Sequence, residues 1–311
     1  MTLVRRSLAF VASAFAALLV AGAMAGAAQA RTELSFGDHD VARTVSFGGS
    51  CQHCELSGRK LIGATFTAAN FNNATLVGSD LRGAQLMGSD FNSSNFTRAD
   101  LRNAQMLAAK FRHAIFISAV LEGVVAQGAD FEEANLTGAR LAGSSLLGAK
   151  FPEATLISAV FANSDMTGTV LTEVKAAGAD FTGATLVLAR LDRGDFSHAS
   201  FRNATMQAAV LKYGNFTNAD FAGAHLEGAD LKGADLSNAH HLTQGQIDLS
   251  CTDHATRLPE GLVARGCSLK ALKAAAIQKA LERALGVPKA APPAAPAPPA
   301  EPRFIAAQNR P

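Results

Sequence analysis

The chain has 311 residues, of which 48% are hydrophobic and 17% are charged, and its 28 Lys and Arg nearly balance its 26 Asp and Glu. Proteins that bind nucleic acid concentrate basic residues in a stripe or patch, so this balance argues against that class. One Tyr and no Trp also leave few aromatic side chains on which bases could stack.

The first 30 residues have the pattern of an export signal. Arg5 and Arg6 precede an apolar run over residues 8–23, and the small residues Ala28 and Ala30 follow. The run is too short for a membrane span, so we expect a secretory signal cleaved after Ala30 and a periplasmic or secreted bacterial protein. No later stretch is apolar enough to span a bilayer. Residues 31–50 contain Gly, Ser and His without periodicity and are predicted to form an irregular entry segment.

A five-residue register runs from Leu56 to Leu236 without interruption. It has 37 sites, and all except Ala126 and Ala176 are Leu, Phe or Met. The residue two places earlier is Ala at 26 of the 36 sites from Ala64 to Ala239. Both positions therefore face a crowded interior, whereas the polar residue just before each site faces solvent. Gly or Asn two places after the site indicates a turn.

Three units illustrate a family resemblance: Ala129-Asp130-Phe131, Ala219-Asp220-Phe221-Ala222-Gly223 and Ala229-Asp230-Leu231-Lys232-Gly233. Over residues 51–241 the chain resembles the pentapeptide-repeat family. The resemblance implies an all-β solenoid, a right-handed quadrilateral parallel β-helix in which four five-residue sides make one 20-residue coil. The length of the register corresponds to about nine coils.

The Phe residues support the 20-residue period independently. One column contains Phe71, Phe91, Phe111, Phe131 and Phe151, and continues as Leu171, Leu191, Leu211 and Leu231. Ten residues away, Leu61, Leu81, Leu101, Leu121 and Leu141 are followed by Phe161, Phe181, Phe201 and Phe221. Each layer thus holds one Phe opposite one Leu, which keeps the cross-section constant. Ala126 and Ala176 follow the same rule, because Val124 and Val174 supply the missing volume.

The 20-residue period also assigns outward residues to four faces. Two faces carry both acidic and basic side chains. We interpret these charges mainly as keeping the protein soluble and the coils in register. One of the others exposes Met87, Leu107, Val125, Leu147, Val187 and Leu188, and its opposite exposes Val77, Ile115, Ile117 and Ile157. Apolar surface often marks contacts, although apolar and β-branched residues also suit strands for structural reasons alone. We hypothesise that one of these faces docks a protein partner, a second copy or an envelope component.

Four cysteines in an exported chain favour disulfides. Three pairings are formally possible, and the most economical has one local bridge at each end, joining Cys51 to Cys54 and Cys251 to Cys267. A redox role for Cys51-x-x-Cys54 lacks the surrounding βαβ pattern. Haem attachment is disfavoured because Glu55 occupies the position that requires His, and a zinc site with His53 lacks a fourth ligand.

The register decays after Leu242. Residues 242–267 resemble the terminal segment of some secreted bacterial pentapeptide proteins, which implies a disulfide-closed loop. Ser268 can cap a helix over residues 268–286, whose incomplete apolar stripe is Leu269, Leu272, Ile277, Leu281 and Leu285. We expect this helix to cover the final coil, with membrane adsorption as the minor alternative. Residues 287–311 are rich in Ala and Pro and are predicted to be a disordered tail.

No catalytic, cofactor-binding or metal motif is evident. The leading interpretation is a non-enzymatic exported scaffold that presents β-helix faces to a protein or envelope partner. The best-known members of the family that it resembles mimic DNA and bind type II topoisomerases. That alternative is disfavoured by the export signal and by the 18 acidic and 15 basic residues within 51–240.

Overall fold

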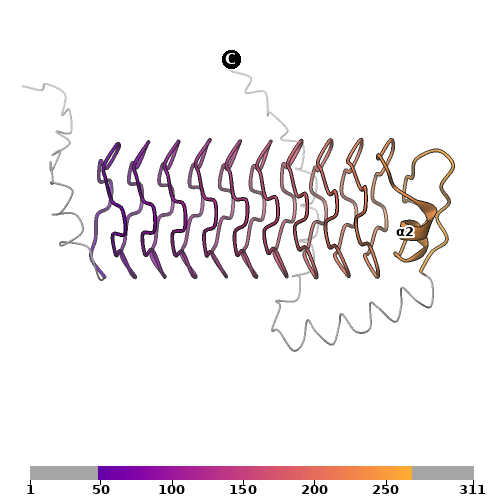
Figure 1. Ribbon diagram of the computed structural model, residues 1–311, viewed down its shortest axis with the longest axis horizontal. Coiled ribbons are helices and arrows are strands. Elements are labelled where there is room, and N and C mark those ends of the chain that lie inside the picture. Colours follow the sequence, from indigo (N-terminus) through magenta and orange to yellow (C-terminus); the bar gives the residue numbers. More distant parts are fainter. Residues whose placement is uncertain (1–47, 268–311) are drawn as a thin grey trace, which may run out of the picture. The chain divides into compact units, whose positions relative to one another are not determined.

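The computed structural model describes residues 48–267, which form a rod of stacked coils followed by a short helix (Figure 1). The predicted signal peptide (1–30), most of the entry segment (31–50), the helix (268–286) and the tail (287–311) lie outside the described residues. Within residues 48–267, no helix has the length and apolar character needed to cross a membrane.

The coils are joined by a regular ladder of parallel bridges. Every fifth residue from Ser50 to Asp220 pairs with the residue 20 positions later, as in Ser50 with Asn70. Four such residues occur in each 20-residue turn, so each coil has four sides and the predicted 20-residue period is confirmed. Each side contributes a single bridged residue rather than a longer strand, because a turn follows every buried site.

Backbone hydrogen bonds explain the five-residue pattern. The Leu76 amide donates to Asn95 O at 2.7 Å in the next coil, and the Asp80 amide donates to Arg59 O at 2.9 Å in the preceding one. A tight turn brings the Ala74 amide to 3.0 Å from Phe71 O. Asn73 in this turn has φ 59° and Gly78 in the following turn has φ 62°, the left-handed region that Gly and Asn tolerate best. The Gly and Asn preference of the sequence therefore reflects the left-handed backbone of the turn, which other residues such as Ser93 and Glu133 also adopt.

Stacked Phe rings run along the core among buried Leu and Ala side chains, as the columns predicted. Phe111 stacks on Phe91 and Phe131 with centroid distances of 5.6 and 5.0 Å, and Phe131 stacks on Phe151 at 4.8 Å. The second column starts at Phe161, whose ring meets Phe151 edge-on at 6.0 Å. The Phe column therefore changes sides of the core through one edge-to-face contact, a favourable aromatic geometry.

Two inward glycines reduce the side-chain volume at the position where Val124 and Val174 increase it. A Cβ atom at Gly194 would lie 2.5 Å from Cε2 of Phe196, and one at Gly214 would lie 2.6 Å from Cε2 of Phe216. Real side-chain carbons do not approach this closely. At these two sites the Phe ring takes the space that Ala occupies in most other coils.

The short helix α2 (Gln244–Asp248) closes the C-terminal end of the rod and is a feature that the sequence did not predict. Thr243 and Gln246 form a capping box, which satisfies amide groups at the helix start. The side chain of Gln246 donates to Phe221 O at 3.0 Å and to Ala224 O at 2.8 Å. Ala224 O would accept from the following coil if the repeat continued, as Ala204 O accepts from the His225 amide. Gln246 therefore replaces a missing coil at this edge.

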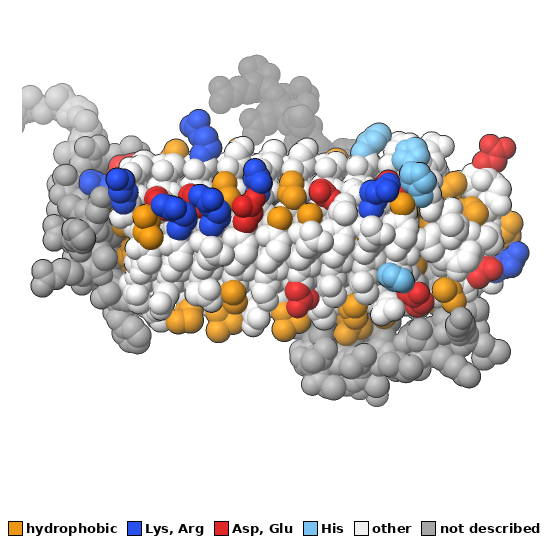
Figure 2. Space-filling view, viewed as in Figure 1, with side chains coloured by type: hydrophobic (Ala, Val, Ile, Leu, Met, Phe, Trp, Pro, Cys, Tyr) orange, Lys and Arg blue, Asp and Glu red, His pale blue; other side chains and the backbone are white. Residues whose placement is uncertain are grey.

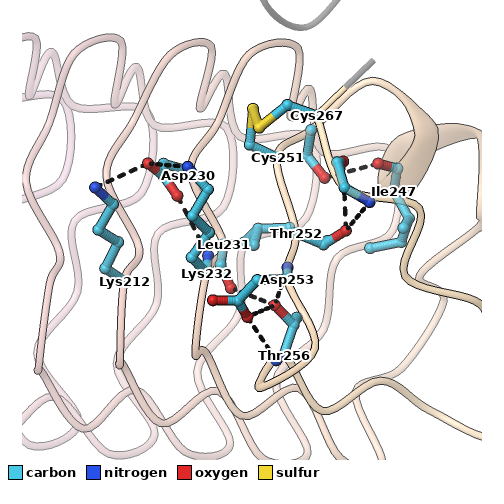
Figure 3. The surroundings of a disulfide bond; sticks show 12 residues. Lys212, Asp230, Leu231, Lys232, Ile247, Cys251, Thr252, Asp253, Thr256 and Cys267 are labelled. Atoms are coloured by element: carbon cyan, nitrogen blue, oxygen red, sulfur yellow. Dashed lines mark hydrogen bonds and ion pairs between the residues drawn. A yellow bond between two sulfur atoms is a disulfide. The ribbon is translucent and has the colours of Figure 1, made fainter.

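Residues after α2 complete this end with a partial coil. Cys251 bridges in parallel to Asp230, and Arg257 does so to Asp235. Inside the partial coil, the Thr256 hydroxyl donates to Leu231 O at 3.1 Å, and Asp253 accepts from the Gly233 amide at 3.0 Å (Figure 3). The expected loop is thus ordered by the same hydrogen bonds that join the repeats.

Candidate interaction faces

The first apolar face is built on the bridge column that includes Gln85, Gln105, Val125, Ser145 and Thr185. We call Met87, Leu107, Val125, Leu147 and Val187 the Leu107 face. Leu107 is 45% exposed and Leu147 is 43% exposed, whereas the other three side chains are half-buried. Gln127 and Thr167 occupy the intervening coils, so large apolar side chains alternate with polar ones along part of this face.

Leu188 does not belong to this exposed face, contrary to the sequence prediction, because it is only 3% exposed. Its turn has the left-handed backbone of the other turns, with φ 62°. The position of Leu188 in the five-residue repeat places it outward, but repeat position does not determine whether an outward side chain is exposed to solvent.

The second apolar face is interrupted more regularly. We call Val77, Ile115, Ile117 and Ile157 the Ile157 face, in which Ile157 is 39% exposed and the other three are half-buried. In the coils between them, the hydroxyls of Thr97 and Thr137 each donate to the neighbouring Asn side chain at 2.6 Å. Val77, Ile117 and Ile157 therefore repeat every second coil, about 10 Å apart at strand spacing.

Charged side chains gather in a row along another part of the rod, separate from a gathering of hydrophobic side chains (Figure 2). Arg82 donates to Asp80 at 2.7 Å and lies 3.8 Å from Asp100, which in turn pairs with Arg102. Hydrogen bonds from Arg82 and Arg102 lower the pKa of Asp80 and of Asp100, respectively, and outweigh the opposing effect of burial. These exposed pairs maintain solubility and register more than stability.

Columns of residues 20 apart account for only some of the ion pairs. Lys110 and Asp90, 20 residues apart, are separated by 3.9 Å. Other contacts join residues 18 apart, from the position after one buried site to the position before the next coil's site. Such contacts are Arg112 with Asp130 at 2.8 Å, Arg202 with Asp220 at 2.7 Å, and Lys212 with Asp230 at 3.0 Å. Opposite charges spaced 18 residues apart are visible in the sequence, and this spacing would have predicted these ion pairs.

Asp220 has the most strongly displaced titration among these carboxylates. Burial raises its pKa, but hydrogen bonds from the Ala222 amide, from Arg202 and from His241 outweigh burial and lower the pKa to about 2. His241 Nδ1 lies 2.9 Å from Asp220 Oδ1 and belongs to the polar rim at the end of the repeats. Between residues 48 and 267, no three His, Cys, Asp or Glu side chains are grouped so that they could hold a metal ion.

The cysteines form the two local bridges that the sequence favoured. Cys51 and Cys54 are joined with Cα atoms 5.4 Å apart, and Cys251 and Cys267 with Cα atoms 4.2 Å apart. Cys51 and Cys251 are both buried. All four sulfur atoms are therefore engaged in disulfides at the two ends of the described rod.

The Pentapeptide repeats family model matches the chain in eight copies, over residues 50–86, 79–116, 104–141, 114–151, 134–173, 149–186, 170–207 and 214–240. The chain belongs to the pentapeptide-repeat family. Its fold is therefore the right-handed quadrilateral β-helix of that family, in agreement with the four-sided bridge ladder. Proteins of this family generally act as structural or interaction proteins.

Solved structures similar to this pentapeptide-repeat chain have low sequence identity. HetL of Nostoc sp. strain PCC 7120, involved in heterocyst differentiation regulation, is 22% identical with a TM-score of 0.34, over 71% of this chain and 99% of HetL. QnrB1, a plasmid-mediated fluoroquinolone resistance protein, is 21% identical with a TM-score of 0.31, over 66% and 94%. A protein of the Arabidopsis thaliana thylakoid lumen is 20% identical with a TM-score of 0.28, over 48% and 84%. No curated protein matches the chain significantly.

Proposed function

We propose that this protein is a non-enzymatic exported scaffold whose β-helix faces bind a protein or envelope partner. The observation that carries the proposal is the exposure of Leu107 and Leu147 on a face whose backbone is held by bridges to the coils on both sides. A face that is already ordered loses little conformational entropy when it binds. Leu107 and Leu147 are already more than half covered, so completing their burial contributes about 0.7–1.4 kcal/mol each, roughly half the value for a fully exposed side chain.

Replacing Leu107 and Leu147 by Lys tests the face. We expect recovery of crosslinked envelope partners, or the fraction of a self-associated species, to fall by about tenfold or more, since tenfold corresponds to only ~1.4 kcal/mol. The matched control replaces Ile62 and Val263 by Lys, because these side chains are 56% and 55% exposed and lie outside both apolar faces. Quantitative crosslinking and light scattering measure the two outcomes. Equal recovery and equal mass for both double variants would remove the Leu107 face from the proposal.

Export is supported by the N-terminal pattern and by the two disulfides, since disulfides persist mainly in oxidising compartments. We expect the mature protein to begin at Arg31 and to fractionate with the periplasm or the medium. N-terminal sequencing of the native protein, together with fractionation, measures both. A chain that keeps residues 1–30 and stays with cytoplasmic markers would contradict export without affecting the test of the faces.

A DNA-mimicking topoisomerase-binding protein is the alternative function, and family membership is what favours it. Residues 51–240 carry 18 acidic and 15 basic residues. A DNA duplex as long as these coils, roughly 45 Å, would carry about 25 negative charges. The surface is therefore a poor electrostatic copy of DNA. Inhibition of gyrase by the mature chain would reverse this ranking.

A further inference from the structure

Each bridged residue directs both of its backbone polar groups toward the preceding coil. The Asp100 amide donates to Ser79 O at 2.9 Å, and Asp100 O accepts from the Leu81 amide at 2.7 Å. In the first coil this position is held by residues that have no coil before them among the described residues. The N-terminal end of the rod, which is indigo in Figure 1, is therefore a β edge.

We call the four bridged residues of the first coil the N-terminal edge: Ser50, Glu55, Lys60 and Thr65. Within residues 48–267, neither the amide nor the carbonyl group of Glu55 or of Lys60 takes part in a hydrogen bond. Both residues are exposed, as is Ser50, whereas most bridged residues of the inner coils are half-buried. An edge with unpaired backbone groups is a template for pairing with another chain.

The C-terminal end of the described rod offers no matching edge. The Cys251 amide donates to Ala229 O at 2.8 Å, and the Arg257 amide donates to Ala234 O at 2.9 Å. On another side of the last coil, the side chain of Gln246 occupies the carbonyl groups. Head-to-tail stacking into a filament is therefore blocked, and a second copy can offer only its own N-terminal edge.

The N-terminal edge is complementary to itself. In an antiparallel ladder, two residues that lie directly opposite each other can exchange both N–H···O bonds. Glu55 and Lys60 each present an amide and a carbonyl group toward the same edge. A two-fold axis perpendicular to the rod makes the sides of a second copy antiparallel to those of the first, so each bridged residue meets one that presents the same two groups.

The helical rise of the coil selects one two-fold axis. Each side lies about 1.2 Å further along the rod than the side before it, a quarter of the ~4.8 Å coil spacing. The axis at the corner between Glu55 and Lys60 pairs these two residues across the copies and also pairs Ser50 with Thr65, which leaves equal gaps on all four sides. Every other two-fold axis leaves gaps that differ by about one coil spacing.

Charge favours the same axis. Glu55 and Lys60 carry opposite charges, and this axis places them side by side twice. The Glu55 carboxylate accepts from the Ser57 amide at 2.8 Å, but neither Glu55 nor Lys60 forms an ion pair within residues 48–267. Residues directly opposite in an antiparallel pair have Cβ atoms about 5 Å apart, close enough for unlike charges to attract and like charges to repel.

We propose that two copies of this chain pair head to head through their N-terminal edges, with Glu55 of each copy opposite Lys60 of the other. The end of one coil is a small interface, so the pairing is expected to depend on protein concentration. It uses the end of the rod and leaves the Leu107 face and the Ile157 face uncovered. The proposal is therefore independent of partner binding at those faces.

Sedimentation velocity of the native protein over a dilution series measures the pairing, with a two-chain species expected at high concentration. Glu55→Lys places like charges opposite each other on two sides, and so does Lys60→Glu, so each single variant should pair about tenfold more weakly. Mixing the two single variants puts Glu opposite Lys again on both sides, and the two-chain species should return. The matched controls are Lys175→Glu and Asp180→Lys, which reverse charges in the same two columns on inner coils and should pair like the native protein.

Carbodiimide crosslinking of a mixture of isotopically light and heavy native chains locates the contact. We expect a direct link between Glu55 of one isotope and Lys60 of the other. A one-chain mass at every concentration would overturn the proposal, as would a two-chain species that both single variants keep. Loss of that species in the Leu107→Lys, Leu147→Lys variant alone would assign the association to the Leu107 face, which also overturns pairing at the edge.

Discussion

Truncating Phe131 to Ala is expected to lower the free energy of unfolding by about 3–5 kcal/mol. The ring is fully buried and stacks between Phe111 and Phe151 at 5.0 and 4.8 Å, so its removal leaves a void that the bridged backbone cannot collapse to fill. Urea denaturation followed by circular dichroism measures the change. The control is Leu107→Ala, whose exposed side chain should cost no more than about 0.5 kcal/mol. Comparable losses for both variants would contradict the stacked core.

A volume exchange sharpens this prediction. The sequence places Leu121 opposite Phe131, so Leu121→Phe alone should overpack the coil and cost about 1–3 kcal/mol. Combined with Phe131→Leu, it restores the total volume while interrupting one ring stack. The double variant should therefore be less destabilised than the sum of the two single variants. Additive losses would show that cross-section volume does not couple the two columns.

Removing the C-terminal disulfide by Cys251→Ser and Cys267→Ser is expected to destabilise this end by about 3 kcal/mol, from the entropy of a loop of about 15 residues. The bridge also holds Cys267 antiparallel against Cys251, and Thr252 bonds to Gly266 beside it. Loss of this pairing exposes a strand edge, so end-to-end association should increase. Urea denaturation and sedimentation velocity measure the two effects.

The matched control removes the other bridge by Cys51→Ser and Cys54→Ser. The cysteines of this bridge are separated by 3 in sequence, whereas those of the C-terminal bridge are separated by 16. Removing the shorter loop should therefore lower the free energy of unfolding by less. A loss equal to that of the C-terminal variant would mean that loop closure is not the main contribution. Unchanged sedimentation of the C-terminal variant would show that Cys267 does not protect the edge.

Several features of the fold could be predicted because they repeat. The positions of Leu, Phe and Ala specify which side chains face inward, and the Phe columns specify the 20-residue coil. The Val124 and Ala126 exchange follows from the same constant volume. The local pairing of the cysteines was also accessible, since one pair opens the repeats and the other follows their end.

Features that do not repeat were missed. Helix α2 occurs where the register has ended, and its role depends on Phe221 and Ala224 carbonyls that only the folded coil brings to Gln246. The 18-residue ion pairs cross from one side of a column to the other, so counting 20-residue columns overlooked them. The apolar residues of the Ile157 face were named without the hydrogen bonds between them, in which Thr97 and Thr137 interrupt the face at alternate coils.

The amino-acid sequence by itself determined the coil, its core and the direction of nearly every side chain, because a five-residue register repeated over residues 56–236 leaves one inward set. Only the tertiary structure decided which outward side chains remain accessible. Leu107 and Leu188 both occupy outward phases, yet the first is 45% exposed and the second 3%. The reason is physical: direction follows from local backbone geometry, whereas accessibility depends on atoms from distant parts of the chain.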